Sequence, residues 1–136
     1  MQNLTYISFL LVATTMVLAA CQTVDVVGAD QRPENIRYLG VQTKPLADDL
    51  VQFHVTLTGT ENPERVEAYA ECAAAQYTLI RGFGFARHIR TTVGQTAERW
   101  NADAVYTISA AIPRGTRTLD AEVVADNCAL NGIPMV

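Results

Sequence analysis

Alternation of apolar and polar residues is most regular over residues 50–58, where every second side chain is apolar. The apolar positions are Val51, Phe53, Val55 and Leu57. A period of two predicts a β-strand with one buried and one solvated face. Residues 36–43 also read as a strand, and the turn-forming Pro45 lies between the two runs. Together the two runs predict an antiparallel hairpin.

The segment that follows predicts an amphipathic helix from Asn62 to Arg81. Asn62 can accept hydrogen bonds from the free N–H groups of the first turn, and Pro63 suits the first helical position. Apolar residues then recur every three or four positions, at Val66, Tyr69, Ala73, Tyr77 and Ile80. Gly82 directly after Arg81 predicts the end of the helix, because glycine readily adopts the left-handed conformation that helix ends use.

Three further strands are predicted over residues 83–93, 104–112 and 118–125. The polar segment 94–103, which holds the one tryptophan, is predicted to be a connection, and residues 126–136 a short helical turn with an extended end. The order strand, strand, helix and three strands indicates an α+β fold. We expect an antiparallel sheet of about five strands with one main helix packed on one face.

The first twenty residues contain no Asp, Glu, Lys or Arg and are almost wholly apolar from residue 4 onward. Their length suits a signal peptide better than a membrane span, which needs about 20 apolar residues. They end in Leu18-Ala19-Ala20-Cys21, small residues followed by a cysteine, which resembles the lipobox of bacterial lipoproteins. The resemblance implies cleavage between Ala20 and Cys21 and attachment of a diacylglyceryl group to Cys21.

One feature of the lipobox pattern is missing, because Met1-Gln2-Asn3 carries no Lys or Arg. Two alternatives therefore stay open: a signal peptide cut before Cys21 without lipid, and an uncleaved anchor helix. Gln22, rather than Asp, after the cysteine favours the outer membrane, facing the periplasm. The chain is then divided into a signal peptide (1–20), a lipidated cysteine with a flexible tether (21–35), and one domain (36–136).

Charge and cysteine content refine this division. The net charge of −4 argues against a nucleic-acid partner, which favours basic surfaces. Of the three cysteines, Cys72 and Cys128 remain as a pair if Cys21 carries lipid, and an envelope compartment is oxidising. We expect a structural disulfide, which would stabilise the fold by about 4 kcal/mol. Two free buried thiols or a redox pair are the alternatives.

No catalytic, cofactor or metal site is predicted, and we expect a protein that is not an enzyme. His54 and His88 lack further ligands at a spacing that would bind a metal. The chain also has no Gly-x-Ser-x-Gly turn and no phosphate-binding loop.

One concentration of cations, formed by Arg81, Arg87, His88 and Arg90, has two interpretations. It could bind an anionic envelope partner such as lipid headgroups, an anionic glycan or a carboxylate on another protein. Alternatively, it is a solvated strand face whose arginines pair with acids such as Asp103. Strand alternation puts Arg87 on one face and both His88 and Arg90 on the other, which favours the second interpretation.

Residues 69–88 and 102–108 resemble small uncharacterised lipoproteins of alphaproteobacteria. The resemblance implies a fold and a cellular location but assigns no role to any residue. The sequence therefore predicts a membrane-anchored lipoprotein of the cell envelope that acts as a structural or interaction module. A periplasmic lipoprotein that binds a small ligand and an envelope hydrolase are the alternatives.

Overall fold

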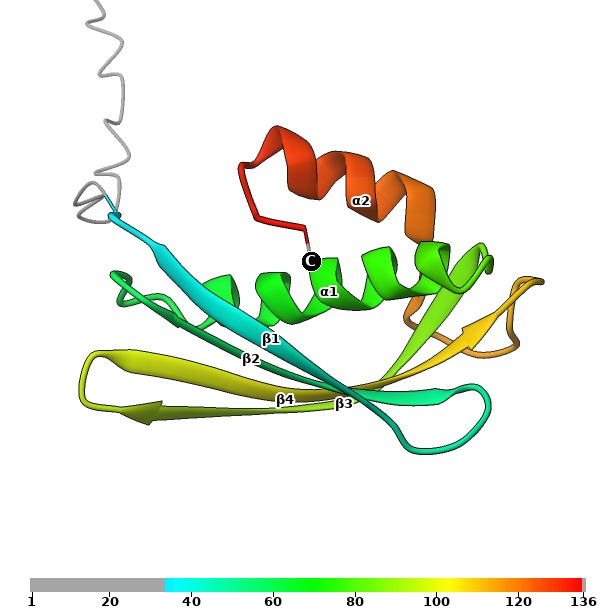
Figure 1. Cartoon of the computed structure of the whole chain (residues 1–136), viewed down its shortest axis with the longest axis horizontal. Coiled ribbons are helices and arrows are strands. Elements are labelled where there is room, and N and C mark those ends of the chain that lie inside the picture. The colour runs from blue at the N-terminus through cyan, green and yellow to red at the C-terminus, as the bar shows by residue number, and fades with distance from the viewer. Residues whose placement is uncertain (1–33, 136) are drawn as a thin grey trace, which may run out of the picture. The chain divides into compact units, whose positions relative to one another are not determined.

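The computed structural model describes residues 34–135, which form an antiparallel sheet of five strands with two helices on one side (Figure 1). The elements in chain order are β1 (Arg37–Pro45), β2 (Leu50–Thr58), α1 (Glu64–Ile80), β3 (Phe85–Thr96), β4 (Arg99–Ser109), β5 (Thr118–Asp120) and α2 (Ala121–Leu130). The predicted α+β class and antiparallel sheet are confirmed, and α2 is an addition. The predicted signal peptide, the lipidation site at Cys21 and the tether up to residue 33 lie outside the described residues.

The strands follow the order β1-β2-β4-β3-β5 across the sheet. β2 therefore pairs with β4 rather than with β3, and the apolar face of β2 meets the apolar face of β4. Phe53, fully buried, pairs with Ala104, and Val51 pairs with Tyr106. In the middle of β4, the small Ala102 and Ala104 lie beside Val55 and Phe53 of β2, which leaves room for α1 to approach the sheet closely.

The edges of the sheet are irregular. β1 carries a β-bulge between Tyr38 and Gly40. β5 covers only the first three residues of β3, Phe85–Arg87, and β3 carries its own bulge between His88 and Arg90 just beyond them. A bulge locally disrupts the hydrogen-bond ladder and bends the strand.

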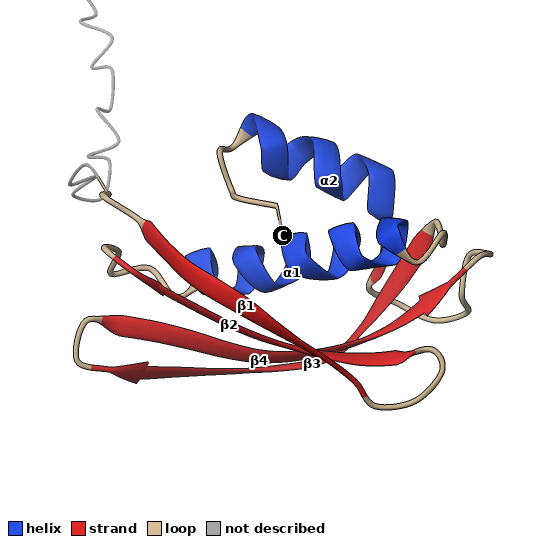
Figure 2. Cartoon of the chain, viewed as in Figure 1, coloured by secondary structure: helices blue, strands red, loops and turns tan. Residues whose placement is uncertain are grey.

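α1 lies between the sheet and α2, and Figure 2 shows α2 on the side of α1 away from the sheet. A helix covered on two sides must be narrow, and the middle of α1 is rich in alanine. Ala70, Ala73 and Ala74 pack in the core against the sheet. Cys72 and Ala75 are also buried, so burial extends beyond the single apolar stripe that the sequence predicts.

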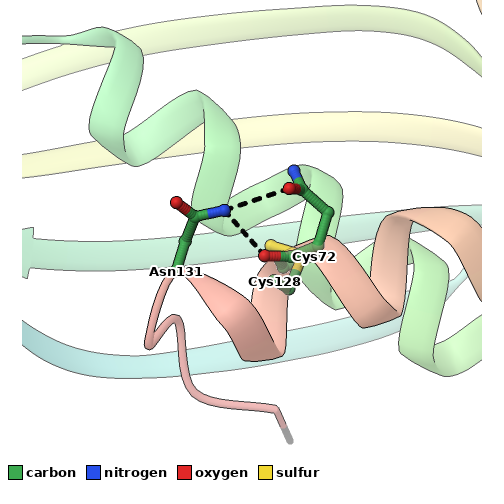
Figure 3. The surroundings of a disulfide bond; sticks show 4 residues. Cys72, Cys128 and Asn131 are labelled. Carbon is green, nitrogen blue, oxygen red and sulfur yellow. Dashed lines mark hydrogen bonds between the residues drawn. A yellow bond between two sulfur atoms is a disulfide. The ribbon is translucent and has the colours of Figure 1, made fainter.

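A disulfide joins the two helices (Figure 3). The Cys72 and Cys128 sulfur atoms are 1.99 Å apart, with 6.0 Å between the Cα atoms. This is the pairing expected from the sequence. Asn131 closes the last turn of α2 beside the bridge, because its Nδ2 donates to the backbone oxygen of Asn127 at 2.7 Å. The bridge attaches α2 to α1 over a sequence separation of 56 residues.

Both helices end in the same way. After α1, Gly82 adopts a φ of 78°, and the N–H of Phe83 donates to the oxygen of Thr78 at 3.0 Å. After α2, Gly132 has a φ of 66°, and the N–H of Ile133 donates to the oxygen of Cys128 at 3.0 Å. In both cases the apolar residue after the glycine packs against the core. The predicted end of α1 at Arg81 and Gly82 is confirmed.

The prediction of a strand over residues 118–125 is wrong beyond Asp120. The side chain of Asp120 accepts hydrogen bonds from the N–H groups of Glu122 and Val123, which starts α2 at this point. The buried side of the helix has a period of three and four, with Ala121, Ala125 and Cys128. Val123, which strand alternation would place on the same side as the partly buried Leu119, is 65% exposed.

The prediction of a connection over residues 94–103 is also wrong, since β3 continues to Thr96 and β4 begins at Arg99. A two-residue turn joins them, with Ala97 at a φ of 54°. This turn lacks the Asn-Gly or Asp-Gly signature by which such hairpins are recognised. Trp100 is therefore a strand residue, and its indole N–H donates to the oxygen of Thr60 at 3.0 Å.

Substituting each of two glycines with alanine should distinguish two causes of lost stability: a clash with the backbone, and the strain of a left-handed conformation. Gly82→Ala adds a methyl group in open space and should lose about 1–2 kcal/mol from the left-handed conformation alone. Gly59 has a φ of 86°, and a methyl group there would overlap the carbonyl oxygen of Asn35. Gly59→Ala should lose about 3 kcal/mol or more. Urea unfolding followed by Trp100 fluorescence measures both losses, and equal losses would contradict the assigned clash.

Candidate interaction surface

Both described helices lie on one side of the sheet (Figure 2), so neither of them covers the opposite side, which we call the open face. Residues directly paired on neighbouring antiparallel strands project from the same side of the sheet. The pairing therefore assigns these side chains to the open face: Arg37, Gln42, Lys44, Leu50, Gln52, His54, Thr56, Thr58, Phe85, Arg87, Arg90, Thr92, Thr96, Arg99, Asn101, Asp103, Val105, Thr107, Ser109, Thr118 and Asp120.

The bulge in β3 changes which predicted patch residues belong together. Arg87 pairs with Thr107 and Arg90 pairs with Val105, so both arginines lie on the open face. The prediction that they point to opposite sides is wrong, because it assumed regular alternation through Ile89. A bulge inserts one extra residue and so restores Arg90 to the face of Arg87.

The other two members of the predicted patch lie elsewhere. His88 pairs with Tyr106 on the helix side of the sheet, and their ring centroids are 5.1 Å apart. Arg81 follows α1, where its Nη1 donates to the hydroxyl of Tyr77 at 2.8 Å. The four residues therefore do not form one patch, although two of them belong to a larger cationic surface.

That surface contains three cations that the sequence prediction left out: Arg37, Lys44 and Arg99, all exposed. Arg99 was missed because its segment was predicted to be a connection. Arg37 was missed because the hairpin was predicted without a register, and Lys44 because it follows the predicted end of the first strand at residue 43. Combining strand alternation with the β1–β2 and β2–β4 pairing would have found all three.

Charge is divided between the two sides of the sheet. The open face carries five cations and two carboxylates: Arg37, Lys44, Arg87, Arg90, Arg99, Asp103 and, at its β5 edge, Asp120. The two helices carry the opposite balance, five carboxylates and one cation: Glu64, Glu67, Glu71, Glu122, Asp126 and Arg65. An acidic protein thus has one side that is strongly basic, a distribution that its net charge conceals.

Asp103, on β4, has partners within the open face. The Nε2 of Gln52 donates to its Oδ2, and Arg90 Nη1 lies 3.1 Å from its Oδ1. This ion pair is the contact that the solvated-face interpretation expects of Arg90. Val105 lies beside this group, paired with both Gln52 and Arg90, and is only 4% exposed. The aliphatic parts of long polar side chains cover such a residue on a sheet face.

The open face is hollowed at the end where β3 turns into β4. The hollow is lined by Thr58, Thr96, Ala97, Glu98, Arg99 and Asn101. Hydroxyl, amide and guanidinium groups in this lining can donate hydrogen bonds, and Glu98 adds one carboxylate at the turn. His54 lies nearer the middle of the same face, opposite Asp103 on β4.

On the helix side, His88 has a partner for each ring nitrogen. Arg117 Nη1 lies 3.0 Å from Nδ1, and the hydroxyl of Thr91 lies 2.7 Å from Nε2. Burial and the neighbouring Arg117 guanidinium lower the pKa of His88, against a smaller opposing effect of Glu67. Because Arg117 can only donate, Nδ1 acts as the acceptor and the imidazole is held neutral.

Burial also shifts the pKa values of Tyr106 and Glu71. It raises the pKa of the Tyr106 hydroxyl, helped by the charges of Glu71 and Glu67, and it raises the pKa of the Glu71 carboxyl. The part of the chain that the structure describes contains no group of three or more His, Cys, Asp or Glu residues placed to bind a metal ion. Neither helix described is long and apolar enough to cross a membrane.

Comparisons with known proteins match this chain to a domain family and to an uncharacterised protein. A family model described as the YNQ4 C-terminal domain matches residues 38–132. The chain is also 32% identical over 88 residues to an "Uncharacterized 26.9 kDa protein in nqo8 5′ region" of Paracoccus denitrificans. The alignment covers 65% of this chain and 34% of that protein, so the chain spans about a third of the relative's length. No solved structure matches.

Replacing His88 with glutamine should remove a pH dependence of stability. The folded protein holds the pKa of His88 below the ordinary 6.5 of the unfolded chain, so below about pH 6.5 the unfolded chain takes up the proton first. The wild type therefore loses stability as pH falls through this range, whereas glutamine still offers Arg117 an acceptor and does not titrate.

Urea unfolding of both proteins between about pH 7.5 and about pH 5.5 measures this effect. The variant should gain stability relative to the wild type as the pH falls. Glu71, whose raised pKa acts in the opposite direction, is present in both proteins and cancels from the comparison. A difference between the two proteins that stays constant with pH would show that His88 does not titrate in this way.

Proposed function

The chain belongs to the YNQ4 C-terminal domain family, and we propose that it is a lipid-anchored module of the bacterial cell envelope whose open face binds an anionic partner. The observation that carries this proposal is the division of charge across the sheet. Five cations against two carboxylates occupy a face that neither of the two described helices covers.

The anchor part of the proposal rests on residues 18–21, whose small residues and cysteine resemble a lipobox. The bridge between Cys72 and Cys128 supports it, because these are two of the three cysteines and Cys21 is the third. A disulfide of this kind belongs to an oxidising compartment, which for a bacterial protein is the envelope. Two acyl chains on one cysteine would give stable membrane attachment.

The binding part rests on where the cations lie. Arg37, Lys44, Arg90 and Arg99 are exposed, and of these only Arg90 lies within ion-pair distance of a carboxylate among the described residues. Cations on one face raise the local concentration of anionic partners and orient their approach. The five acids of the two helices would repel the same partners from the opposite side.

Cys21→Ser should abolish processing and lipidation together. Serine has no thiol to accept the diacylglyceryl group, so the protein should remain an unprocessed precursor without the acyl mass. Mass spectrometry of the intact protein measures both changes. Thr23→Ser, two residues further along, serves as the matched control and should be processed normally. A Cys21→Ser protein that is cut before residue 21 and released in soluble form would refute the anchor.

The binding part predicts that Lys44 is protected in the envelope. Lys44 is the one lysine of the chain and is exposed on the open face, so an amine-reactive reagent reports on this surface at a single side chain. Acetylation of Lys44 should be several-fold slower in isolated envelopes than in detergent-purified protein, and high salt should restore it because salt screens exposed charges. Equal rates in both preparations would refute binding through this face.

A further inference from the structure

We propose that the partner of the open face is an anionic lipid surface, on which the domain lies with its helices turned away from the membrane. This inference rests on the proposed function, since it names the partner of the same face. Three features support it: the side of the sheet on which the cations lie, their spacing, and the side chains between them.

The separation of cations and carboxylates onto opposite sides of the sheet favours one orientation of the domain on a membrane. The chain as a whole is negative, so an anionic bilayer repels it in most orientations. Only with the open face toward the lipid do the cations approach the headgroups while the carboxylates of α1 and α2 stay on the far side of the sheet. Each cation near an anionic membrane surface strengthens attachment by about fivefold.

The cations are spread rather than clustered. Lys44, Gln52, Val105 and Arg90 form one row across four strands, which separates the two cations by about 14 Å. A second row, with Arg37 and Arg99 both paired to Thr58, lies about 20 Å away along the strands. A single small ligand cannot span these distances, whereas a plane of headgroups presents a negative charge to every cation.

The side chains between the cations suit headgroups better than nucleic acid. The open face of the described strands has no Tyr or Trp, and its one Phe, Phe85, lies at the start of β3. Single-stranded nucleic acids are bound on sheet faces by stacking of bases on such aromatic residues. Threonine, asparagine and glutamine instead offer hydrogen-bond donors to phosphate oxygens, as in the hollow beside Arg99.

With a lipid on Cys21, this electrostatic attraction would be sufficient to hold the open face on the membrane surface. Tethering two surfaces raises their effective concentration, so a second, weak contact forms without high intrinsic affinity. The first open-face cation, Arg37, is also the first residue of β1, the first strand of the domain. The face is thus close in sequence to the proposed anchor.

The test compares Lys44 acetylation in the native, full-length protein reconstituted into two kinds of vesicle, phosphatidylcholine alone and phosphatidylcholine mixed with phosphatidylglycerol. Lys44 should react about fivefold more slowly on the anionic vesicles, and about 1 M salt should remove the difference. Hydroxyl-radical labelling of Val123 and Leu130, exposed on α2, provides the internal control and should be equal on both vesicles.

Two charge variants complete the test. Arg37→Gln combined with Arg99→Gln removes two open-face cations and should weaken the attachment about 25-fold, which restores Lys44 reactivity on anionic vesicles. Arg65→Gln combined with Arg81→Gln changes the net charge equally on the side of α1 and should leave Lys44 protected. Trp100 fluorescence checks that both variants are folded.

Equal Lys44 rates on the two vesicles, from a protein that carries the acyl mass, would overturn the lipid partner and leave the anchor standing. If protection appeared only when envelope proteins were added, the partner would be an acidic protein, and the lipid inference would again be overturned. A protein without acyl mass that still binds anionic vesicles through the open face would support the lipid inference and refute the anchor.

Discussion

Packing of the described domain takes place on one side of its sheet, and most other features depend on this. β2 and β4 direct their apolar side chains toward α1, and α1 in turn is covered by α2. Alanines at Ala70, Ala73 and Ala74 allow this close stacking, because a larger side chain there would separate the helix from the sheet. Since both helices lie on one side, the polar residues of the strands are left uncovered on the other.

The disulfide matters because α2 has little else to hold it. Among the described elements α2 packs mainly on α1 and the short β5, and its Val123 and Leu130 are exposed. A ten-residue helix is marginal without tertiary contacts. Linking Cys128 to Cys72 in the middle of α1 fixes α2 over the part of α1 that the sheet does not cover, and this completes the burial of α1.

Local signals explain what the sequence could predict. β2 was found in full because its alternation is set by one buried face, and α1 was found because Asn62 and Gly82 mark its ends. The side-chain oxygen of Asn62, Oδ1, indeed accepts a hydrogen bond from the backbone N–H of Glu64 at 2.9 Å. The features that were missed depend on distant partners. α2 is shaped by its contact with α1, and the β3–β4 turn at Ala97 is held by strand pairing rather than by turn-forming residues.

The candidate surface could be predicted only in part for the same reason. Arg87 and Arg90 were identified as candidate binding residues, but their shared orientation depends on one inserted residue, Ile89, that no local pattern reveals. Arg37 and Arg99 belong to the same surface through β2, to which both strands pair at Thr58. A surface of this kind becomes visible only when the strand order is known.

The two bulges also affect how copies of this domain can associate with one another. An edge strand offers unpaired N–H and C=O groups, so neighbouring copies can join edge to edge and aggregate. β1 interrupts its free edge at Tyr38 and Gly40 and ends in Lys44 and Pro45, while β3 interrupts its own edge just past β5. Both borders of the sheet are thereby unfavourable templates for another strand.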